Sequence, residues 1–269
     1  MPLSCTNLRL AYGRHTAIAG VSLALRQGAI HALIGPNGSG KSTLLHALAG
    51  LITPNAGTVE IHGRPLRTIR RRALAQRLAF LPQQPIAPEE MTVERLVLQG
   101  RFAHVGLLRG YRPVDIEAVQ WALESTGLAA LAARPLHALS GGERQRAWIA
   151  TALAQEADIL LLDEPTSFLD IGHQVEILNL LLRLSRERGI TVAMAIHDID
   201  QAMAVADRIV LLDTGRLMFE GTANDLAVSG LVEQAFRVTG RFVQVEPSGA
   251  WHLDLTLDPT AQAHRLDDK

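Results

Sequence analysis

Residues 35–43 read GPNGSGKST, a glycine-rich segment that ends in a lysine and two hydroxyl side chains. The segment fits the pattern G-x-x-x-x-G-K-[ST], whose glycines let the backbone curl until successive N–H groups point at phosphate oxygens. The Lys41 ammonium would bridge the β- and γ-phosphates of a nucleoside triphosphate, and the Ser42 hydroxyl would ligate Mg²⁺. The predicted nucleotide ligands here are Gly35, Pro36, Asn37, Gly38, Ser39, Gly40, Lys41, Ser42 and Thr43.

Lysine is almost absent from the rest of the chain. Of the 26 basic residues, only Lys41 and Lys269 are lysine, and Lys269 is the last residue. A compact ammonium fits between phosphate oxygens where a planar guanidinium would not. The pattern has two interpretations: codon bias with Lys41 as an accident, or a position that cannot accept arginine.

Two carboxylates end the apolar run of residues 157–164, ADILLLDE. A buried strand of this composition would deliver Asp163 and Glu164 to the sheet edge where α/β proteins bind ligands. Asp163 suits Mg²⁺ coordination, directly or indirectly, and Glu164 suits polarising an attacking water as a general base. An acidic turn at a strand end is the alternative interpretation, which the phosphate loop in the same chain disfavours.

Three further residues are ambiguous when taken one at a time. His197 ends the next apolar run and is either a structural histidine or a group beside the γ-phosphate. Gln83, between two prolines in FLPQQP, would in isolation be a solvated loop residue. Tyr12 either stacks on an adenine ring or packs in the core.

A second glycine pair lies at residues 139–145, LSGGERQ, directly before a helical pattern. Ser140, Gly141 and Gly142 would then sit at a helix N-terminus, which attracts anions. If this segment cannot reach the nucleotide of its own chain, it can reach that of a partner. Two copies facing head to tail would each place a phosphate loop and a borrowed helix end around one nucleotide, an arrangement that suits a C₂ dimer.

The elements that must position these residues alternate between strands and helices. Strands are predicted over 29–35, 157–164 and 190–198, a hairpin over 208–221, and helices over 41–50 and 172–189. Strand–helix–strand alternation of this kind predicts a parallel α/β sheet. Residues 86–154 are mostly helical in pattern and predict a helical subdomain inserted into the α/β core. The tail from about residue 226 carries only weak strand signals.

The composition is that of a globular chain of 269 residues with a formal net charge of −1. This charge argues against a dedicated nucleic-acid binder, and the basic run RTIRRR at 67–72 is interpreted as a solvated helix face. The single cysteine, Cys5, excludes an internal disulfide and fits a reducing compartment. No apolar run reaches the ~20 residues of a membrane-spanning helix, and the N-terminus does not resemble a signal peptide. We expect a cytosolic protein that a partner would have to hold at any membrane.

GPNGSGKST, LSGGERQ, ILLLDE, SFLD and the strand-end histidine, in this order, resemble the nucleotide-binding subunit of ABC transporters over roughly residues 3–225. The resemblance implies an α/β P-loop NTPase with a parallel-sheet core, an N-terminal antiparallel β part and an inserted helical subdomain. The predicted units are an ATPase domain over 1–240, made of a core (1–85 and 155–225) and a helical subdomain (86–154), and a C-terminal extension over 226–269.

The resemblance also implies a role for each site residue. Tyr12 would stack on adenine, Gln83 would sense Mg²⁺ and the membrane partner, and residues 140–145 would form the signature that closes on the opposing ATP. Residues 167–170 would be the D-loop, and His197 the switch histidine. The implied catalytic set is Lys41, Gln83, Glu164 and His197; the metal set is Ser42, Gln83 and Asp163; the nucleotide-binding residues outside the P-loop are Tyr12, Ser140, Gly141, Gly142, Glu143 and Asp170.

The segments LSGGERQRAWIATALAQ, LDIGHQVEILNLLLRL, GRFAHVGLL and IHDIDQAMAVADRIVLLDTGRL are similar to the import subfamily that serves ferric siderophores and, less closely, haem or cobalamin. That similarity implies a homodimeric ATPase with ATP and Mg²⁺ as cofactors, held peripherally at the cytoplasmic face of the membrane by multi-span permease subunits. A periplasmic or surface substrate-binding protein would take part indirectly, and no nucleic acid would be bound.

Three other functions fit the motifs less well. A soluble ABC-type ATPase acting on DNA or ribosomes would carry a long coiled-coil insertion or a second P-loop, and the sequence has neither. A non-enzymatic ATP-binding regulator would not need the carboxylate of Glu164. Exporters often fuse this domain to membrane helices, and none are predicted in this chain.

Overall fold

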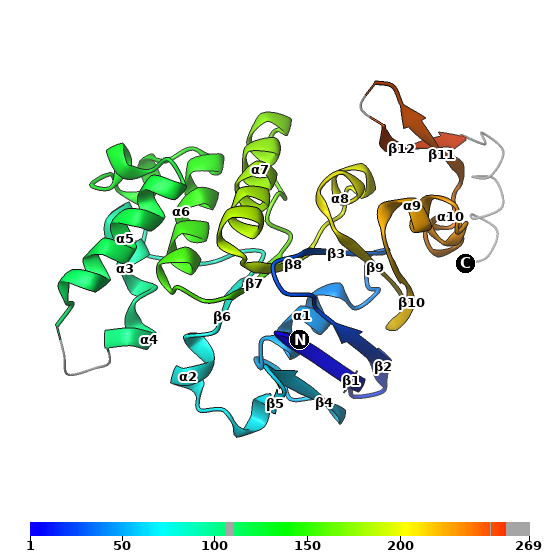
Figure 1. Cartoon of the computed structure of the whole chain (residues 1–269), viewed down its shortest axis with the longest axis horizontal. Coiled ribbons are helices and arrows are strands. Elements are labelled where there is room, and N and C mark those ends of the chain that lie inside the picture. The colour runs from blue at the N-terminus through cyan, green and yellow to red at the C-terminus, as the bar shows by residue number, and fades with distance from the viewer. Residues whose placement is uncertain (106–109, 248, 257–269) are drawn as a thin grey trace.

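The structure is a computed structural model that describes residues 1–105, 110–247 and 249–256. Residues 106–108 of the segment GRFAHVGLL and residues 257–269 of the predicted C-terminal extension lie outside this part of the chain. Figure 1 shows a central sheet with helices above it and a second, smaller sheet below it.

A six-stranded sheet forms the centre of the molecule. Its strands are parallel except β10, which pairs antiparallel with β9. In spatial order they are β10 (Arg216–Gly221), β9 (Arg208–Asp213), β3 (Ile30–Ile34), β8 (Thr191–Ala195), β7 (Ile159–Asp163) and β6 (Leu78–Leu81). Every residue of β3, β7 and β8 is buried, because other elements cover both faces of the sheet. The α/β class predicted from alternating apolar runs and helical patterns is confirmed.

A smaller antiparallel sheet covers one face of the central sheet and encloses a helix. Its strands, in spatial order, are β2 (His15–Ala24), β1 (Leu3–Tyr12), β4 (Ala56–Ile61) and β5 (Arg64–Pro65). Helix α1 (Lys41–Leu48) lies between the two sheets. Its Leu44 belongs to the same hydrophobic core as Leu8 of β1 and Leu33 of β3. Along β3, Ala32 and Ile34 face the opposite core, as the period-2 alternation of a strand requires.

Helices α7 (Ile171–Arg188) and α8 (Ile199–Val205) cover the other face of the central sheet (Figure 1). A second group of helices lies beside its β6 edge: α3 (Val93–Gln99), α5 (Pro113–Ser125) and α6 (Gly141–Ala154), with the short helices α2 (Arg71–Ala75) and α4 (Phe102–Val105) nearby. Arg101, only 1% exposed, ties the group together, because its guanidinium binds Asp115 at 3.0 Å and the Ala154 carbonyl at 2.7 Å. The described regular elements within 86–154 are helices, and the boundaries of the predicted subdomain stay a prediction.

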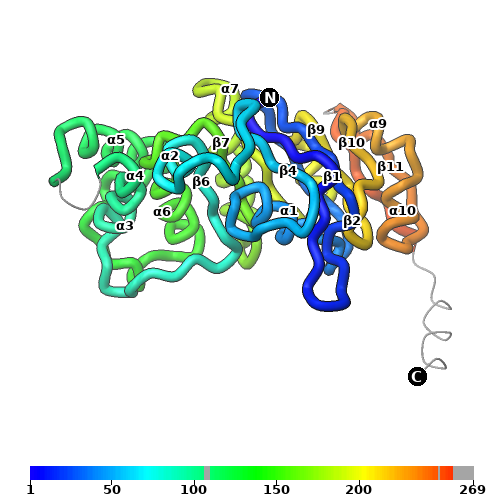
Figure 2. The backbone as a smooth tube through the Cα atoms, turned by 90° about the horizontal axis from the view of Figure 1, so that it is seen from below, coloured from blue at the N-terminus to red at the C-terminus, as the bar shows by residue number. Residues whose placement is uncertain are grey.

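The chain beyond β10 forms α9 (Ala223–Ala227), α10 (Leu231–Phe236) and a two-stranded hairpin of β11 (Thr239–Val245) and β12 (Ala250–Thr256). Figure 2 places these C-terminal elements at the opposite end of the molecule from α3, α5 and α6. Figure 1 shows the hairpin next to α8, away from the central sheet. The weak strand signals of the tail therefore correspond to a real hairpin.

His31 is a buried titratable group in the middle of this fold. It lies on β3 with no exposed surface, and its Nε2 accepts the backbone N–H of Arg26 at 3.1 Å. Burial lowers the pKa of His31 from 6.5 to about 4, because water cannot solvate the imidazolium. Between these two pH values the unfolded chain binds a proton that the folded chain does not, so the free energy of unfolding must fall as the pH drops.

We expect the free energy of unfolding to be roughly 2 kcal/mol smaller at pH 5 than at pH 7 through this residue alone. Urea unfolding at both pH values measures the difference. In a His31→Gln variant, whose side chain does not titrate, the pH dependence over this range should shrink by that amount. An equally steep dependence in both proteins would show that folding does not lower the pKa of His31.

Candidate nucleotide-binding and catalytic site

The glycine-rich loop connects β3 to α1 at the carboxyl end of the central sheet. Gly35 and Gly40 have φ angles of 145° and 103°, a region that side chains with a Cβ rarely adopt. A Cβ on Gly35 would lie 2.0 Å from the Leu212 carbonyl oxygen, and one on Gly40 would lie 2.7 Å from the Ala17 carbonyl oxygen. Glycine is therefore required at both positions by the neighbouring strands as well as by the curl of the loop.

Lys41 lies inside this loop. Its side chain is nearly buried, and Nζ donates hydrogen bonds to the carbonyl oxygens of Gly35 at 2.7 Å and Pro36 at 3.1 Å. Burial lowers the pKa of Lys41, and the negative charges of Glu164 and Asp163 oppose that shift. The loop carbonyls around the Lys41 ammonium leave little space for the larger guanidinium group. This favours the interpretation that arginine cannot replace Lys41.

Ser42 and Asp163 form an oxygen-rich pair beside the loop. The Ser42 hydroxyl donates to Asp163 Oδ1 at 2.9 Å, and Asp163 is 4% exposed. Burial raises the pKa of Asp163, while the bond from Ser42 lowers it. A hydroxyl and a carboxylate are hard oxygen ligands of the kind Mg²⁺ prefers. Within the described residues no three His, Cys, Asp or Glu side chains cluster as a metal site, so phosphate oxygens and water would have to complete the coordination.

Glu164 directly follows β7 and has a φ of 53°, in the left-handed region. Its carboxylate is contacted by Gln83, Ser167 and His197. His197 Nε2 lies 2.5 Å from Oε1. Gln83 Nε2 donates to Oε2 at 2.5 Å, and the Ser167 hydroxyl donates to the same oxygen at 2.8 Å. The carboxylate is thus held by three groups, one from its own loop and two from segments distant in sequence.

The lateral order of the strands explains this convergence. β8 lies between β3 and β7, so the loop after each of these strands opens at the same edge. His197 follows β8 and is therefore placed between the glycine-rich loop and Glu164. Gln83 follows β6, the neighbour of β7 on its other side.

The second glycine pair caps α6. The Ser140 hydroxyl accepts the Glu143 N–H at 3.2 Å, and the Ser140 N–H donates to Glu143 Oε2 at 2.8 Å, a reciprocal capping box. The backbone hydrogen bond from Ser140 lowers the pKa of Glu143. A Cβ on Gly142 would lie 2.1 Å from the His173 ring of α7, so this glycine is needed for the contact between the two helices.

The segment 140–145 contacts the loop after β7 of its own chain rather than the P-loop. Gln145 Nε2 donates to the Pro165 carbonyl at 2.9 Å. In the part of the chain that the structure describes, no hydrogen bond joins residues 35–43 to residues 140–145. Figure 1 shows α6 among the helices at one end of the molecule and α1 under the central sheet. The two predicted phosphate-binding segments therefore do not form one cradle within a single chain.

The remaining predicted ligands, Asp170 and Tyr12, occupy different environments. Asp170 is the N-cap of α7: Oδ1 accepts the His173 N–H at 2.9 Å and Oδ2 lies 2.7 Å from His173 Nδ1. These hydrogen bonds lower the pKa of Asp170. Tyr12 is 52% exposed at the end of β1, so the alternative that it packs in the core is wrong. Its ring is open for stacking, which stays a prediction.

Gln174 was not identified from the sequence. Its Nε2 donates to the carbonyl oxygen of Thr166 at 3.3 Å and to that of Leu169, in the D-loop, at 3.0 Å. A glutamine within an amphipathic helical pattern gives no signal of such a contact. The contact exists because α7 turns back along the loop that precedes it, which only the tertiary structure shows.

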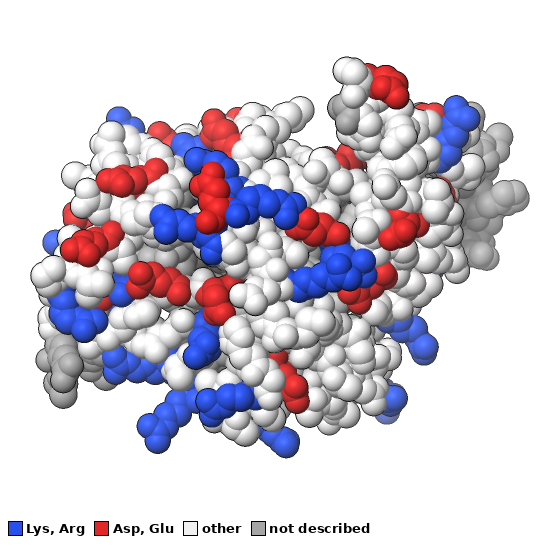
Figure 3. All heavy atoms as spheres, in the orientation of Figure 1, with Lys and Arg blue, Asp and Glu red and all other residues white. Residues whose placement is uncertain are grey.

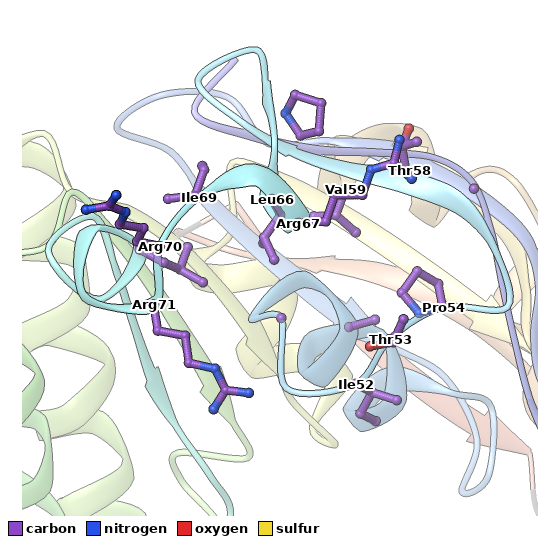
Figure 4. Close-up of a pocket in the computed structure, with 15 residues that line it drawn as sticks. Ile52, Thr53, Pro54, Thr58, Val59, Leu66, Arg67, Ile69, Arg70 and Arg71 are labelled. Atoms are coloured by element: carbon purple, nitrogen blue, oxygen red, sulfur yellow. The ribbon is translucent and has the colours of Figure 1, made fainter.

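A separate hollow of about 420 Å³ lies between α1, β4 and α2 (Figure 4), and none of the predicted site residues line it. Arg67, Arg70 and Arg71 of the RTIRRR run lie around it. This run is not one helix face: Leu66–Thr68 form a short 3₁₀ turn and α2 begins at Arg71. On the face that Figure 3 shows, basic and acidic side chains are interspersed.

The glycine-rich loop and the acidic strand end on a parallel sheet define a P-loop nucleoside triphosphatase. Residues 18–167 match the family model of ABC transporters. The iron(3+)-hydroxamate import ATP-binding protein FhuC of Bacillus subtilis is 41% identical over 90% of both chains. The ferric enterobactin transport ATP-binding protein FepC of Escherichia coli is 41% identical over 85% of this chain and 84% of that protein.

Solved structures agree with the sequence relatives. A transporter described as of metal-chelate type, in an inward-facing conformation, has a chain that superposes with a TM-score of 0.84 at 31% identity, covering 96% of this chain and 98% of that one. The dimeric ABC transporter cassette MJ0796 superposes with a TM-score of 0.72 at 29% identity over 82% of this chain and 98% of that one. The chain belongs to the ABC transporter family and is one of its ATP-binding, ATP-hydrolysing subunits. No helix in the described ranges has the length and apolar character needed to cross a bilayer.

Proposed function

We propose that this chain drives the import of a ferric siderophore or a similar metal chelate through a separate membrane permease. The observation that carries the proposal is the 41% identity to FhuC over 90% of both chains, where FhuC is an iron(3+)-hydroxamate import ATP-binding protein. FepC and the metal-chelate type transporter point in the same direction. No residue of this chain needs to touch the cargo, so the cargo assignment rests on relatives rather than on the site.

The arrangement around Glu164 supports a general-base mechanism. The carboxylate accepts hydrogen bonds from Gln83 and Ser167 and lies next to His197, which fixes its orientation before a water arrives. Lys41 would hold the β- and γ-phosphates, while loop N–H groups and the N-terminus of α1 would bind the remaining oxygens. Mg²⁺, held by Ser42 with Asp163 and Gln83, would neutralise phosphate charge when bound.

Two copies would share the ATP. The signature at the N-terminus of α6 does not meet the P-loop of its own chain, whereas a second copy in head-to-tail orientation could present it. The dimeric structure of the MJ0796 cassette supports this arrangement. ATP binding would close the dimer and hydrolysis would open it, a two-state change that requires ATP to bind the closed form more tightly.

The working complex would contain this homodimer and multi-span permease subunits at the cytoplasmic face of the membrane. Gln83 and the helices of 86–154 would transmit the closure of the dimer to the permease. A periplasmic or surface substrate-binding protein would deliver the chelate without contacting this chain, and nucleic acid would have no part.

Uptake of a radiolabelled ferric siderophore in cells that lack this chain tests the proposal. Uptake should be lost, the wild-type chain should restore it, and a Glu164→Gln chain made at the same level should not. Haem and cobalamin uptake, measured in parallel, separate the alternatives, since a cobalamin import ATP-binding protein of Halobacterium salinarum is 39% identical over 88% of this chain. Normal siderophore uptake with lost cobalamin uptake would overturn the siderophore assignment.

A further inference from the structure

The C-terminal hairpin is bonded to the helix that follows His197. Asp200 of α8 receives two contacts from β12: His252 Nδ1 lies 2.5 Å from Oδ2, and the backbone N–H of Leu253 donates to Oδ1 at 3.0 Å. Beside them, Trp251 Nε1 donates to Asn224 Oδ1 at 2.7 Å. Both oxygens of one carboxylate are therefore held by the same strand, which restricts rotation as well as displacement of the first turn of α8.

This first turn is continuous with the switch histidine. Asp198 is the N-cap of α8 and accepts the Gln201 N–H at 3.0 Å, so the helix begins directly after His197. Asp200 lies in the same turn. A helix of seven residues is marginal by itself, so its direction depends on the elements packed against it. Any shift of α8 would move His197 relative to Glu164.

The same turn of α8 is also bonded to α7, through the residue that follows Asp200. Gln201 Nε2 donates to Gln174 Oε1 at 2.7 Å. Gln174 in turn holds the carbonyl oxygens of Thr166 and Leu169. Two adjacent residues of this turn, Asp200 and Gln201, thus connect the hairpin, through Gln174, to the loop that carries Ser167 and follows Glu164.

We propose that the hairpin of β11 and β12 positions the hydrolytic site, with Asp200 as the positioning residue through which it acts on His197. The inference rests on the proposed role of His197 beside the γ-phosphate. The hairpin lies outside residues 18–167, the region that matches the family model, and contributes no residue to the P-loop, the signature or the carboxylates. Its effect on hydrolysis is exerted entirely by holding α8 in place.

A purely structural role makes a different prediction. Phe242, Trp251 and Leu253 pack against the main hydrophobic core, so a hairpin that only covers apolar surface would change stability without changing the catalytic step. A positioning role lowers kcat while leaving the KM for ATP nearly unchanged, because the hairpin's side-chain contacts, in the described part of the chain, are with Asp200 and Asn224 and not with the P-loop or Tyr12. The two roles are separated by kinetics measured together with the melting temperature.

The test is a double variant, Trp251→Phe with His252→Ala, which removes both side-chain hydrogen bonds and keeps the aromatic packing. We expect kcat for ATP to fall about three- to tenfold, as for the loss of one or two hydrogen bonds, with KM changed less than about twofold. The matched control is Arg241→Ala with Asp254→Ala, which removes an ion pair of 3.7 Å within the same hairpin. The control should keep the wild-type kcat, and its melting temperature should be comparable with that of the Trp251→Phe, His252→Ala variant.

A variant that restores only the donor gives a second check. The single variant His252→Asn places an amide N–H near the position of the histidine Nδ1. Its kcat should recover most of the loss measured in the single variant His252→Ala. Wild-type kcat in the double variant, or a loss as large in the control, would overturn the inference.

A double-mutant cycle with His197→Ala shows whether the effect passes through the switch histidine. If it does, the hairpin double variant should cause less than about a twofold further loss in the His197→Ala background. The full three- to tenfold loss persisting there would refute the positioning path while leaving the function of the chain intact. Unchanged hydrolysis in His197→Ala alone would instead remove the proposed role of His197, so the two failures are distinguishable.

Discussion

Replacing Glu164 by glutamine should slow ATP hydrolysis by roughly two to four orders of magnitude while leaving ATP binding intact. The amide is nearly the same size and its oxygen can still accept from Gln83 and Ser167, but it cannot take a proton from water. The phosphate ligands of the P-loop are unchanged. The variant should therefore accumulate as an ATP-bound dimer that elutes earlier on size-exclusion chromatography.

The measurement compares single-turnover hydrolysis and ATP affinity in both proteins. Glu187→Gln is a suitable control, since this exposed carboxylate near the end of α7 lies outside the site and its loss should change neither property. Turnover at the wild-type rate in Glu164→Gln would mean that another group activates the water, and the convergence of Gln83, Ser167 and His197 on this carboxylate would need another explanation.

Replacing Ser140 by arginine should abolish ATP-driven dimerisation and leave ATP binding by the single chain largely unchanged. The hydroxyl caps α6 and has no bond to the P-loop of its own chain, so a bulky cation there cannot touch the nucleotide until a second copy approaches. At that moment the arginine side chain would occupy the space that the phosphates of the partner need.

Loss of the helix cap must be separated from loss of the shared site. Removing an N-cap hydroxyl costs about 1 kcal/mol of stability wherever it occurs. Thr222→Arg breaks a comparable capping box on α9, far from the signature, and should keep the dimer. Dimerisation is best scored in the Glu164→Gln background, where hydrolysis does not dissolve it. If Ser140→Arg destroyed ATP binding in the dilute single chain, the signature would belong to the site of its own chain.

Several parts of the site were predictable because they are local. The loop of residues 35–43 requires glycine for its own backbone conformation. The apolar run 157–164 predicts a buried strand that ends in Asp163 and Glu164. The capping box of Ser140 and Glu143 likewise depends only on residues within one four-residue segment. Such features depend on neighbouring residues along the chain, so their geometry follows from sequence alone.

Other features escaped prediction because their partners are distant in sequence. The ring of Tyr12 could not be assigned to core or surface until β1 was placed in the small sheet, where its last residue is exposed. The RTIRRR run was interpreted as a helix face, although the chain breaks the helix between Thr68 and Arg71. The contacts of Gln174 and of His252 with Asp200 carry no local signal at all.

The amino-acid sequence by itself determined the class of protein, the phosphate loop and the identity of the chemical groups, since each is encoded by residue types at fixed short spacing. The tertiary structure alone decided that β7 lies between β8 and β6, which brings His197 from one side and Gln83 from the other to the carboxylate of Glu164. It also decided that the hairpin reaches α8. Strand order and docking are set by pairing and burial between segments far apart in the chain, and periodicity within one segment contains no information about its neighbours in space.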